Sequence, residues 1–132
     1  MQKTSTPVFF LVDDDEDDLL FLKHSLEKEY PRCQVRTYTN GQEFMQMIDQ
    51  PETLPSLIFL DLNMPNPDGF ELLTKLRSLP GSRPLPIVIL SVSEDARDMT
   101  RSRQLGASAY YVKPSRISDF ESLVQSVGQY LV

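Results

Sequence analysis

The sequence contains one cysteine, no tryptophan and no apolar run longer than a strand. The single Cys33 excludes a disulfide framework and a thiolate metal cluster. The N-terminal stretch MQKTSTP lacks the hydrophobic region of a signal peptide, so we expect a cytoplasmic protein without a membrane span. Basic residues are also scarce, 13 against 19 acidic ones, for a net charge of −6. The chain therefore lacks the basic surface that direct binding to nucleic acid requires.

The length of 132 residues fits one domain with a single hydrophobic core. The hydrophobic fraction of 40% and the charged fraction of 24% are typical of a folded globular protein. We therefore expect one domain over residues 1–132, with a core of about residues 7–131.

Short apolar runs alternate with segments of helical periodicity. The runs are residues 8–12, 35–38, 57–60, 87–90 and 110–112. The first and third are apolar at nearly every position, which is typical of parallel strands covered on both faces. Between the runs, leucines and other apolar residues recur three and four positions apart. This alternation predicts an α/β fold with a doubly wound, five-stranded parallel sheet and helices on both faces.

Two segments near the C-terminus carry helix signals of different strength. In the sequence SDFE, Ser118 is placed to cap the last helix and Glu121 to complete the capping box. The segment 94–105 has few apolar residues before a glycine stop at Gly106, which predicts a weakly docked fourth helix.

Polar residues suited to metal binding or catalysis follow four of the apolar runs. Asp13 and Asp14 follow the first, Asp61 the third, Ser91 the fourth and Lys113 the fifth. The carboxyl ends of parallel strands lie at one edge of the sheet, and ligands bind there in doubly wound folds. We therefore expect these five residues to converge in one crevice.

This set of residues is suited to a metal and to phosphoryl chemistry. Carboxylate oxygens without histidine or cysteine favour Mg²⁺ or Mn²⁺. The ammonium of Lys113 adds a fixed positive charge, and a carboxylate can attack phosphorus. The pattern predicts a divalent metal site next to a phosphoryl acceptor.

The run DDDEDD, residues 13–18, divides into two parts on this interpretation. The first two acids face the crevice. Asp15 is placed to cap the first helix, and Glu16, Asp17 and Asp18 lie in its first turn, where the helix dipole stabilises negative charge.

Four motifs give the chain a resemblance to the receiver domain of two-component response regulators. They are LVDDD, LDLNMPNPDG, VILS and GASAYYVKP, and the resemblance extends over essentially the whole length. It implies the flavodoxin-like strand order 2-1-3-4-5, which receiver domains share with flavodoxin. Because the sequence ends within the last predicted helix, we expect a stand-alone receiver.

The resemblance also implies a role for each matching residue. Asp61 would accept the phosphoryl group, and Lys113 and Ser91 would contact its oxygens. Mg²⁺ would be held by Asp13, Asp14, Asp61 and the main-chain carbonyl of Asn63. Tyr110 would be the switch aromatic, with Tyr111 on the opposite face of the strand, and the Lys113–Pro114 bond would be cis.

The implied function is phosphorylation-dependent signalling rather than turnover of a substrate. A histidine kinase or phosphotransfer protein would be the donor, because His24 is interpreted as a solvated helix position. The fourth helix, fifth strand and fifth helix would form the face for a downstream protein or for a second copy of the chain.

Two alternatives from other classes remain at this stage. One is a Mg²⁺-dependent phosphatase with an aspartate nucleophile, but Asn63 stands where such enzymes usually have a second aspartate, and an amide cannot act as the general acid. The other is a constitutive docking protein with an unused pocket.

Overall fold

The computed structural model describes residues 6–49, 55–82 and 84–131. Its strands are β1 (Val8–Val12), β2 (Gln34–Tyr38), β3 (Leu57–Leu60), β4 (Ile87–Ser91) and β5 (Ala109–Val112). Its helices are α1 (Glu16–Glu29), α2 (Gly41–Ile48), α3 (Gly69–Ser78), α4 (Ala96–Gln104), α5 (Ile117–Ser126) and the short 3₁₀ helix η1 (Val127–Tyr130). The predicted core of residues 7–131 includes positions 50–54 and 83, which lie outside the described residues. Within the described part of the chain, no helix is long and apolar enough to cross a membrane.

The five described strands form one parallel sheet in the order β2-β1-β3-β4-β5. This confirms the predicted fold class, strand order and parallel direction. Strands β1, β3 and β4 occupy the middle of the sheet, and nearly all of their residues are buried. Strand β2 lies at an edge of the sheet, and its residues are exposed or half-buried. The continuous apolar runs therefore marked the strands that are covered on both faces.

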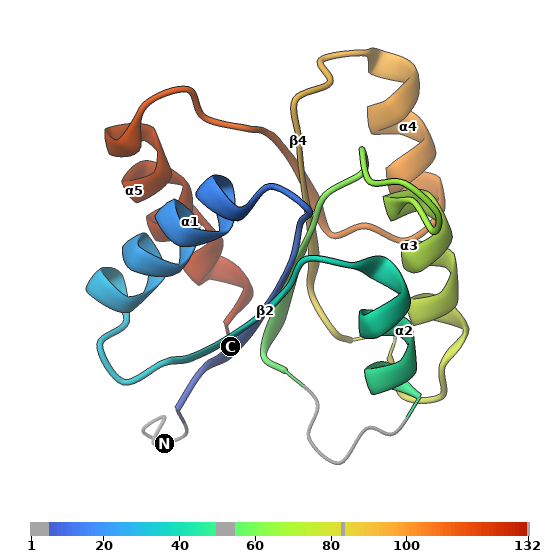
Figure 1. Ribbon diagram of the computed structural model, residues 1–132, viewed down its shortest axis with the longest axis horizontal. Helices are drawn as coiled ribbons and strands as arrows, with labels where there is room; N and C mark the ends of the chain where they lie inside the picture. The colour runs from blue at the N-terminus through green and yellow to red at the C-terminus, as the bar shows by residue number, and fades with distance from the viewer. Residues whose placement is uncertain (1–5, 50–54, 83, 132) are drawn as a thin grey trace.

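Helices cover both faces of the sheet. Helices α1 and α5 lie on one face, and α2, α3 and α4 lie on the other (Figure 1). Each face has its own hydrophobic cluster. The first contains Phe10, Phe44, Leu73 and Ile89, and the second contains Phe9, Leu26, Phe59 and Phe120, among others. The sheet is thus the central layer between two cores.

Side chains cap the N-termini of four helices. Asp15, Asn40, Asp68 and Asp95 each accept hydrogen bonds from backbone N–H groups in the first turn of the helix that follows. A cap of this kind contributes about 1 kcal/mol. The predicted role of Asp15, and the positions of Glu16, Asp17 and Asp18 in the first turn of α1, are confirmed.

The predicted capping box of the last helix is wrong. Helix α5 begins at Ile117, its N-cap residue is Arg116, and no side chain caps it. The helix thus starts ahead of Ser118, which lies inside the first turn, where its side chain no longer occupies the N-cap position. A Ser-x-x-Glu pattern is a local signal, and here it did not set the helix boundary.

Helix α4 is weakly anchored, as predicted. Ser102 is the one buried residue of this helix. On its exposed side, the guanidinium of Arg101 lies 4.1 Å from the ring centre of Phe70 in α3, so a cation–π contact joins the two helices. Gly106 ends the segment with a φ of 106°, a conformation that favours glycine.

Candidate functional site

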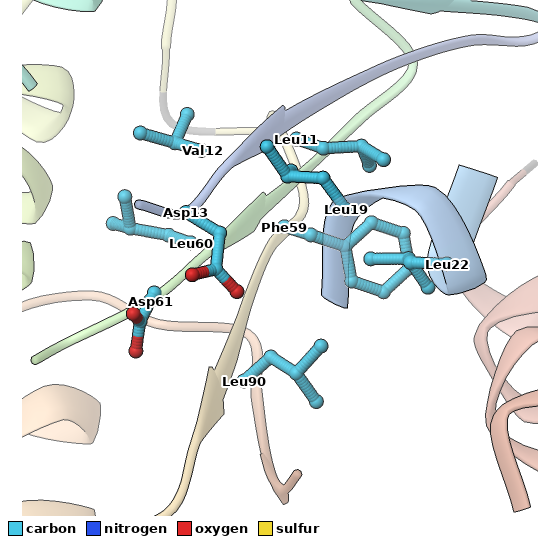
Figure 2. Close-up of a pocket in the computed structure, with 9 residues that line it drawn as sticks. All are labelled: Leu11, Val12, Asp13, Leu19, Leu22, Phe59, Leu60, Asp61 and Leu90. Carbon is cyan, nitrogen blue, oxygen red and sulfur yellow. The ribbon is translucent and has the colours of Figure 1, made fainter. Parts of the chain in front are cut away.

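The carboxyl edge of the sheet collects the predicted site residues. Asp13 follows β1 and Asp61 follows β3, and both line a small recess at the ends of these strands (Figure 2). Ser91 is the last residue of β4, and Lys113 follows β5. The floor of the recess is formed by Leu11, Val12, Leu19, Leu22, Phe59, Leu60 and Leu90. The sheet therefore brings together residues that are up to a hundred positions apart.

Two tight turns fix the buried carboxylates. Asp13 is 5% exposed and Asp61 is 3% exposed. The Oδ1 of Asp13 accepts the N–H of Asp15 at 2.9 Å, and the Oδ1 of Asp61 accepts the N–H of Asn63 at 3.1 Å. Each carboxylate thus binds the backbone two residues later, as aspartate commonly does in turns. In both cases the second oxygen, Oδ2, is left for other partners.

Lys113 supplies the cation for those oxygens. Its Nζ lies 2.8 Å from Asp18 Oδ2, 2.9 Å from Asp13 Oδ2 and 3.6 Å from Asp61 Oδ2. The lysine side chain is 9% exposed, so these contacts lie largely away from water. One ammonium therefore faces three carboxylates.

Burial and charge shift the pKa values of this pair. Burial raises the pKa of Asp13 to about 7, against the lowering effect of the Asp15 N–H and of Lys113. Burial alone would lower the pKa of Lys113, but hydrogen bonds to Asp18 and Asp13 outweigh it and hold its pKa above the ordinary value. The ammonium is therefore charged at neutral pH, whereas Asp13 keeps a raised pKa even with Lys113 2.9 Å away.

A divalent metal fits this set of donors. Oxygen atoms of Asp13, Asp14 and Asp61 lie within 4.8 Å of one another. Asp14 is exposed, which leaves one side of the cluster open to solvent. The donors are hard oxygen ligands, suited to Mg²⁺ or Mn²⁺, and a single ammonium does not balance their charge. The three predicted acidic ligands are thus brought together, whereas metal ligation by the Asn63 carbonyl stays a prediction.

Hydrogen bonds connect the Ser91 region to Tyr110. The Ser91 hydroxyl donates to Asn63 Oδ1 at 2.6 Å and accepts the N–H of Ser93 at 3.1 Å. The Tyr110 hydroxyl donates to the carbonyl of Ser93 at 2.9 Å. Tyr110 packs on one core and Tyr111 on the other, which confirms their predicted opposite faces. The two residues predicted to act as a switch are therefore joined through Ser93.

Two expectations about this edge need correction. The Lys113–Pro114 bond is not cis; among the described residues the cis peptide bond is Asn66–Pro67. Asp18 was not predicted as a site residue, because its place in the first turn of α1 accounted for it. Asp18 does lie there, but its carboxylate also accepts a hydrogen bond from Lys113, 95 positions along the chain. Helical position alone gave no sign of this pairing.

Comparisons with known proteins agree with this architecture. The family model of the response regulator receiver domain matches residues 9–125. The response regulator Rcp1 of Synechocystis sp. is 27% identical over 98% of this chain and 93% of its own length. The solved Mn²⁺-bound form of Rcp1 has a TM-score of 0.84, with 95% of this chain and 94% of that chain covered at 27% identity.

Two further relatives extend the comparison. The phosphorylated cyanobacterial phytochrome response regulator RcpA has a TM-score of 0.88 at 29% identity, with 96% of this chain and 94% of that chain covered. The transcriptional regulatory protein PrrA of Mycobacterium leprae is 32% identical over 93% of this chain, but the match spans 50% of PrrA. The chain thus matches nearly all of some relatives and half of another.

Proposed function

Because the chain belongs to the response regulator receiver domain family, we propose that it accepts a phosphoryl group on Asp61 in a Mg²⁺-dependent reaction. A phosphoacceptor role is general to that family. Receivers work with histidine kinases or phosphotransfer proteins, and we propose such a protein in the cytoplasm as the donor. The whole chain would act as a single receiver domain.

The observation that carries the proposal is the position of Lys113 between the acids. Asp61 alone would be a buried carboxylate, but the Lys113 ammonium 3.6 Å from its Oδ2 can neutralise charge that arrives there. Asp13 and Asp14 add oxygen donors within reach of the same point. Electrostatic positioning of this kind supplies most of what phosphoryl transfer needs.

The proposed reaction is a transfer between a histidine and an aspartate. A carboxylate oxygen of Asp61 forms a bond to phosphorus while the phosphorus–nitrogen bond of the donor phosphohistidine breaks. The electron pair stays on the imidazole nitrogen, which takes a proton from solvent. Mg²⁺, when bound, would neutralise oxygens of the transferring group. Loss of the phosphoryl group to water then restores the carboxylate, so the chain takes part in its own chemistry without turning over a separate substrate.

Mg²⁺ is proposed as the resident metal, with Mn²⁺ as a substitute. The oxygen donors of Asp13, Asp14 and Asp61 suit both ions. Rcp1 has been solved with Mn²⁺ bound, which supports the proposal that this chain also binds a divalent ion. We propose the Asn63 main-chain carbonyl as a further ligand.

The proposed output is a change of shape that begins at Ser91. When its hydroxyl turns from Asn63 toward a phosphoryl oxygen, the hydrogen bonds through Ser93 to Tyr110 are free to rearrange. Helix α4 can shift in response to this rearrangement at a low cost in free energy, because Ser102 is its one buried residue. We propose that the surface of α4, β5 and α5 presents the two states to a downstream protein or a second copy of the chain.

The test is incubation of the protein with Mg²⁺ and acetyl phosphate, followed by intact mass measurement and a phosphate-release assay. A receiver gives one phosphoryl group per chain, and none in Asp61→Ala. Sustained release of phosphate from added phosphate esters would instead indicate the phosphatase. The absence of any phosphoryl adduct would indicate the docking protein. Either of those results would contradict the proposal.

A further inference from the structure

Asp18 brings a fourth carboxylate to the pocket from helix α1. Its Oδ2 lies 2.8 Å from Lys113 Nζ, which is the shortest of the three carboxylate contacts of that ammonium. The Asp18 side chain is 24% exposed, so the pair is shielded from much of the solvent. Asp18 does not belong to the three-acid cluster of Asp13, Asp14 and Asp61. It therefore binds the pocket's lysine without belonging to the candidate metal site.

The Lys113 ammonium lies on the α1 side of the pocket. An ammonium has three N–H donors. Asp18 and Asp13 are within hydrogen-bond distance, whereas Asp61 Oδ2 at 3.6 Å is beyond it. Two of the three N–H donors are thus engaged by Asp18 and Asp13, and these two short contacts hold the ammonium away from Asp61 and from a phosphoryl oxygen on it.

We infer that Asp18 competes with the phosphoryl group on Asp61 for Lys113, and so limits how readily Asp61 is phosphorylated. This inference rests on the proposed function. Asp13 would share its charge with a bound metal, but Asp18 lies outside the cluster and keeps its whole charge for Lys113. The negative charge of Asp18 also repels an incoming anion, which acts in the same direction. Asp18 is thus a positioning residue that acts through Lys113.

The helix role of Asp18 can be separated from its role at Lys113. The N–H of Asp18 donates to the Asp15 carboxylate at 3.1 Å, and a side-chain substitution leaves that N–H in place. Asp17 precedes it in the same first turn and is exposed. Among the described residues, the ion pairs of Lys113 do not include Asp17. Asp17→Asn therefore removes the same charge from the same turn without touching the lysine.

The experiment measures the binding of beryllium trifluoride, a phosphoryl analogue that attaches to a carboxylate oxygen, in saturating Mg²⁺. Wild type, Asp18→Asn, Asp17→Asn and Asp18→Glu are compared by NMR titration, after thermal denaturation has shown each to be folded. We expect Asp18→Asn to bind about threefold to tenfold more tightly, the range for a partly shielded ion pair. Phosphorylation by acetyl phosphate should accelerate by a similar factor. Asp17→Asn and Asp18→Glu should stay within about twofold of wild type.

A readout in the unmodified protein avoids any question of folding. The side-chain carboxyl ¹³C signal of Asp18 should shift when beryllium trifluoride is added to wild type, because Lys113 leaves it, while that of Asp17 should stay in place. The inference is overturned if Asp18→Asn binds beryllium trifluoride no more tightly than wild type, or if Asp17→Asn or Asp18→Glu gains as much affinity. It is also overturned if the Asp18 carboxyl signal does not shift in wild type. If wild type forms an Asp61 adduct while the Asp18 results fail, only the competition is refuted; if wild type forms none, the proposed function falls and the competition with it.

Discussion

Gly69 permits the close contact that holds the backbone of Asp61 and Leu62 in place after β3. It is the first residue of α3, and its N–H donates to the carbonyl of Leu62 at 3.2 Å. A Cβ added at this position would lie 2.3 Å from the Asp61 carbonyl oxygen, 2.5 Å from the Leu62 Cα and 2.9 Å from the Asp61 carbonyl carbon. All three are backbone atoms, so no side-chain rotation can relieve the contact. Gly69→Ala must therefore move the backbone that carries Asp61.

The size of the effect follows from that overlap. Cβ contacts below 3.0 Å are essentially never found, so the backbone must shift by at least 0.7 Å, the difference from 2.3 Å. Overpacking of this kind costs about 1–3 kcal/mol in the free energy of unfolding. A displacement of about 1 Å at a reacting group can slow a reaction by up to about 100-fold. We expect Gly69→Ala to lose both stability and phosphorylation rate.

The assay combines urea denaturation, followed by circular dichroism, with the rate of phosphorylation by acetyl phosphate at a temperature where all variants are folded. Gly81→Ala is the matched control. Gly81 has a φ of 80° and an added Cβ would have no neighbour within 4 Å, so that variant should lose about 1–2 kcal/mol through backbone strain alone. Its phosphorylation rate should equal that of wild type. A Gly69→Ala protein with wild-type stability and rate would refute the reasoning.

Three further predictions address single residues of the site. Asp14→Ala should lower Mg²⁺-dependent phosphorylation by at least about 100-fold, because it removes a proposed metal ligand, whereas Asp17→Ala should stay within about twofold. Equal losses would contradict the division of the acidic run. Tyr110→Phe removes the hydrogen bond to the Ser93 carbonyl and should lower the free energy of unfolding by about 1 kcal/mol in urea denaturation, and an unchanged value would show that this bond contributes nothing. In the presence of a chelator, the pKa of Asp13 is about 7 in the folded protein and 3.8 in the unfolded chain, so the folded protein binds this proton more tightly. Protonation of Asp13 therefore contributes stability that rises as the pH falls from about 7 toward 3.8. Thermal denaturation of wild type and Asp13→Asn across that range should show a smaller rise in the variant, and parallel profiles would contradict the role of burial.

The sequence was sufficient to predict the fold class and the positions of most candidate site residues. Strands β1, β3 and β4 are covered on both faces, so their continuous apolar runs identified them without any knowledge of their partners. Asp61 stood out because a charge directly follows a fully buried run. Parallel strands then place the residues that follow them at one edge, which accounts for the convergence of Asp13, Asp61, Ser91 and Lys113.

The remaining features depend on contacts that local patterns do not encode. Asp18 resembles any first-turn acid in sequence, and its contact with Lys113 depends on how α1 is oriented over the sheet. Ser118 carried a capping signal, but α5 starts ahead of it at Ile117. The hydrogen bond from Ser91 to Asn63 likewise joins the end of β4 to the loop after β3, and only the folded sheet defines their relative positions.

The proposed function depends on Asp61 as the residue that carries the phosphoryl group. The most direct measurement treats the protein with Mg²⁺ and acetyl phosphate, reduces the acyl phosphate with sodium borohydride to convert the modified aspartate to homoserine, and locates that residue by peptide mass spectrometry. We expect homoserine at position 61 only, and only when Mg²⁺ and the phosphodonor are both present. Homoserine at Asp13, Asp14 or Asp18, or its absence from position 61, would contradict the account.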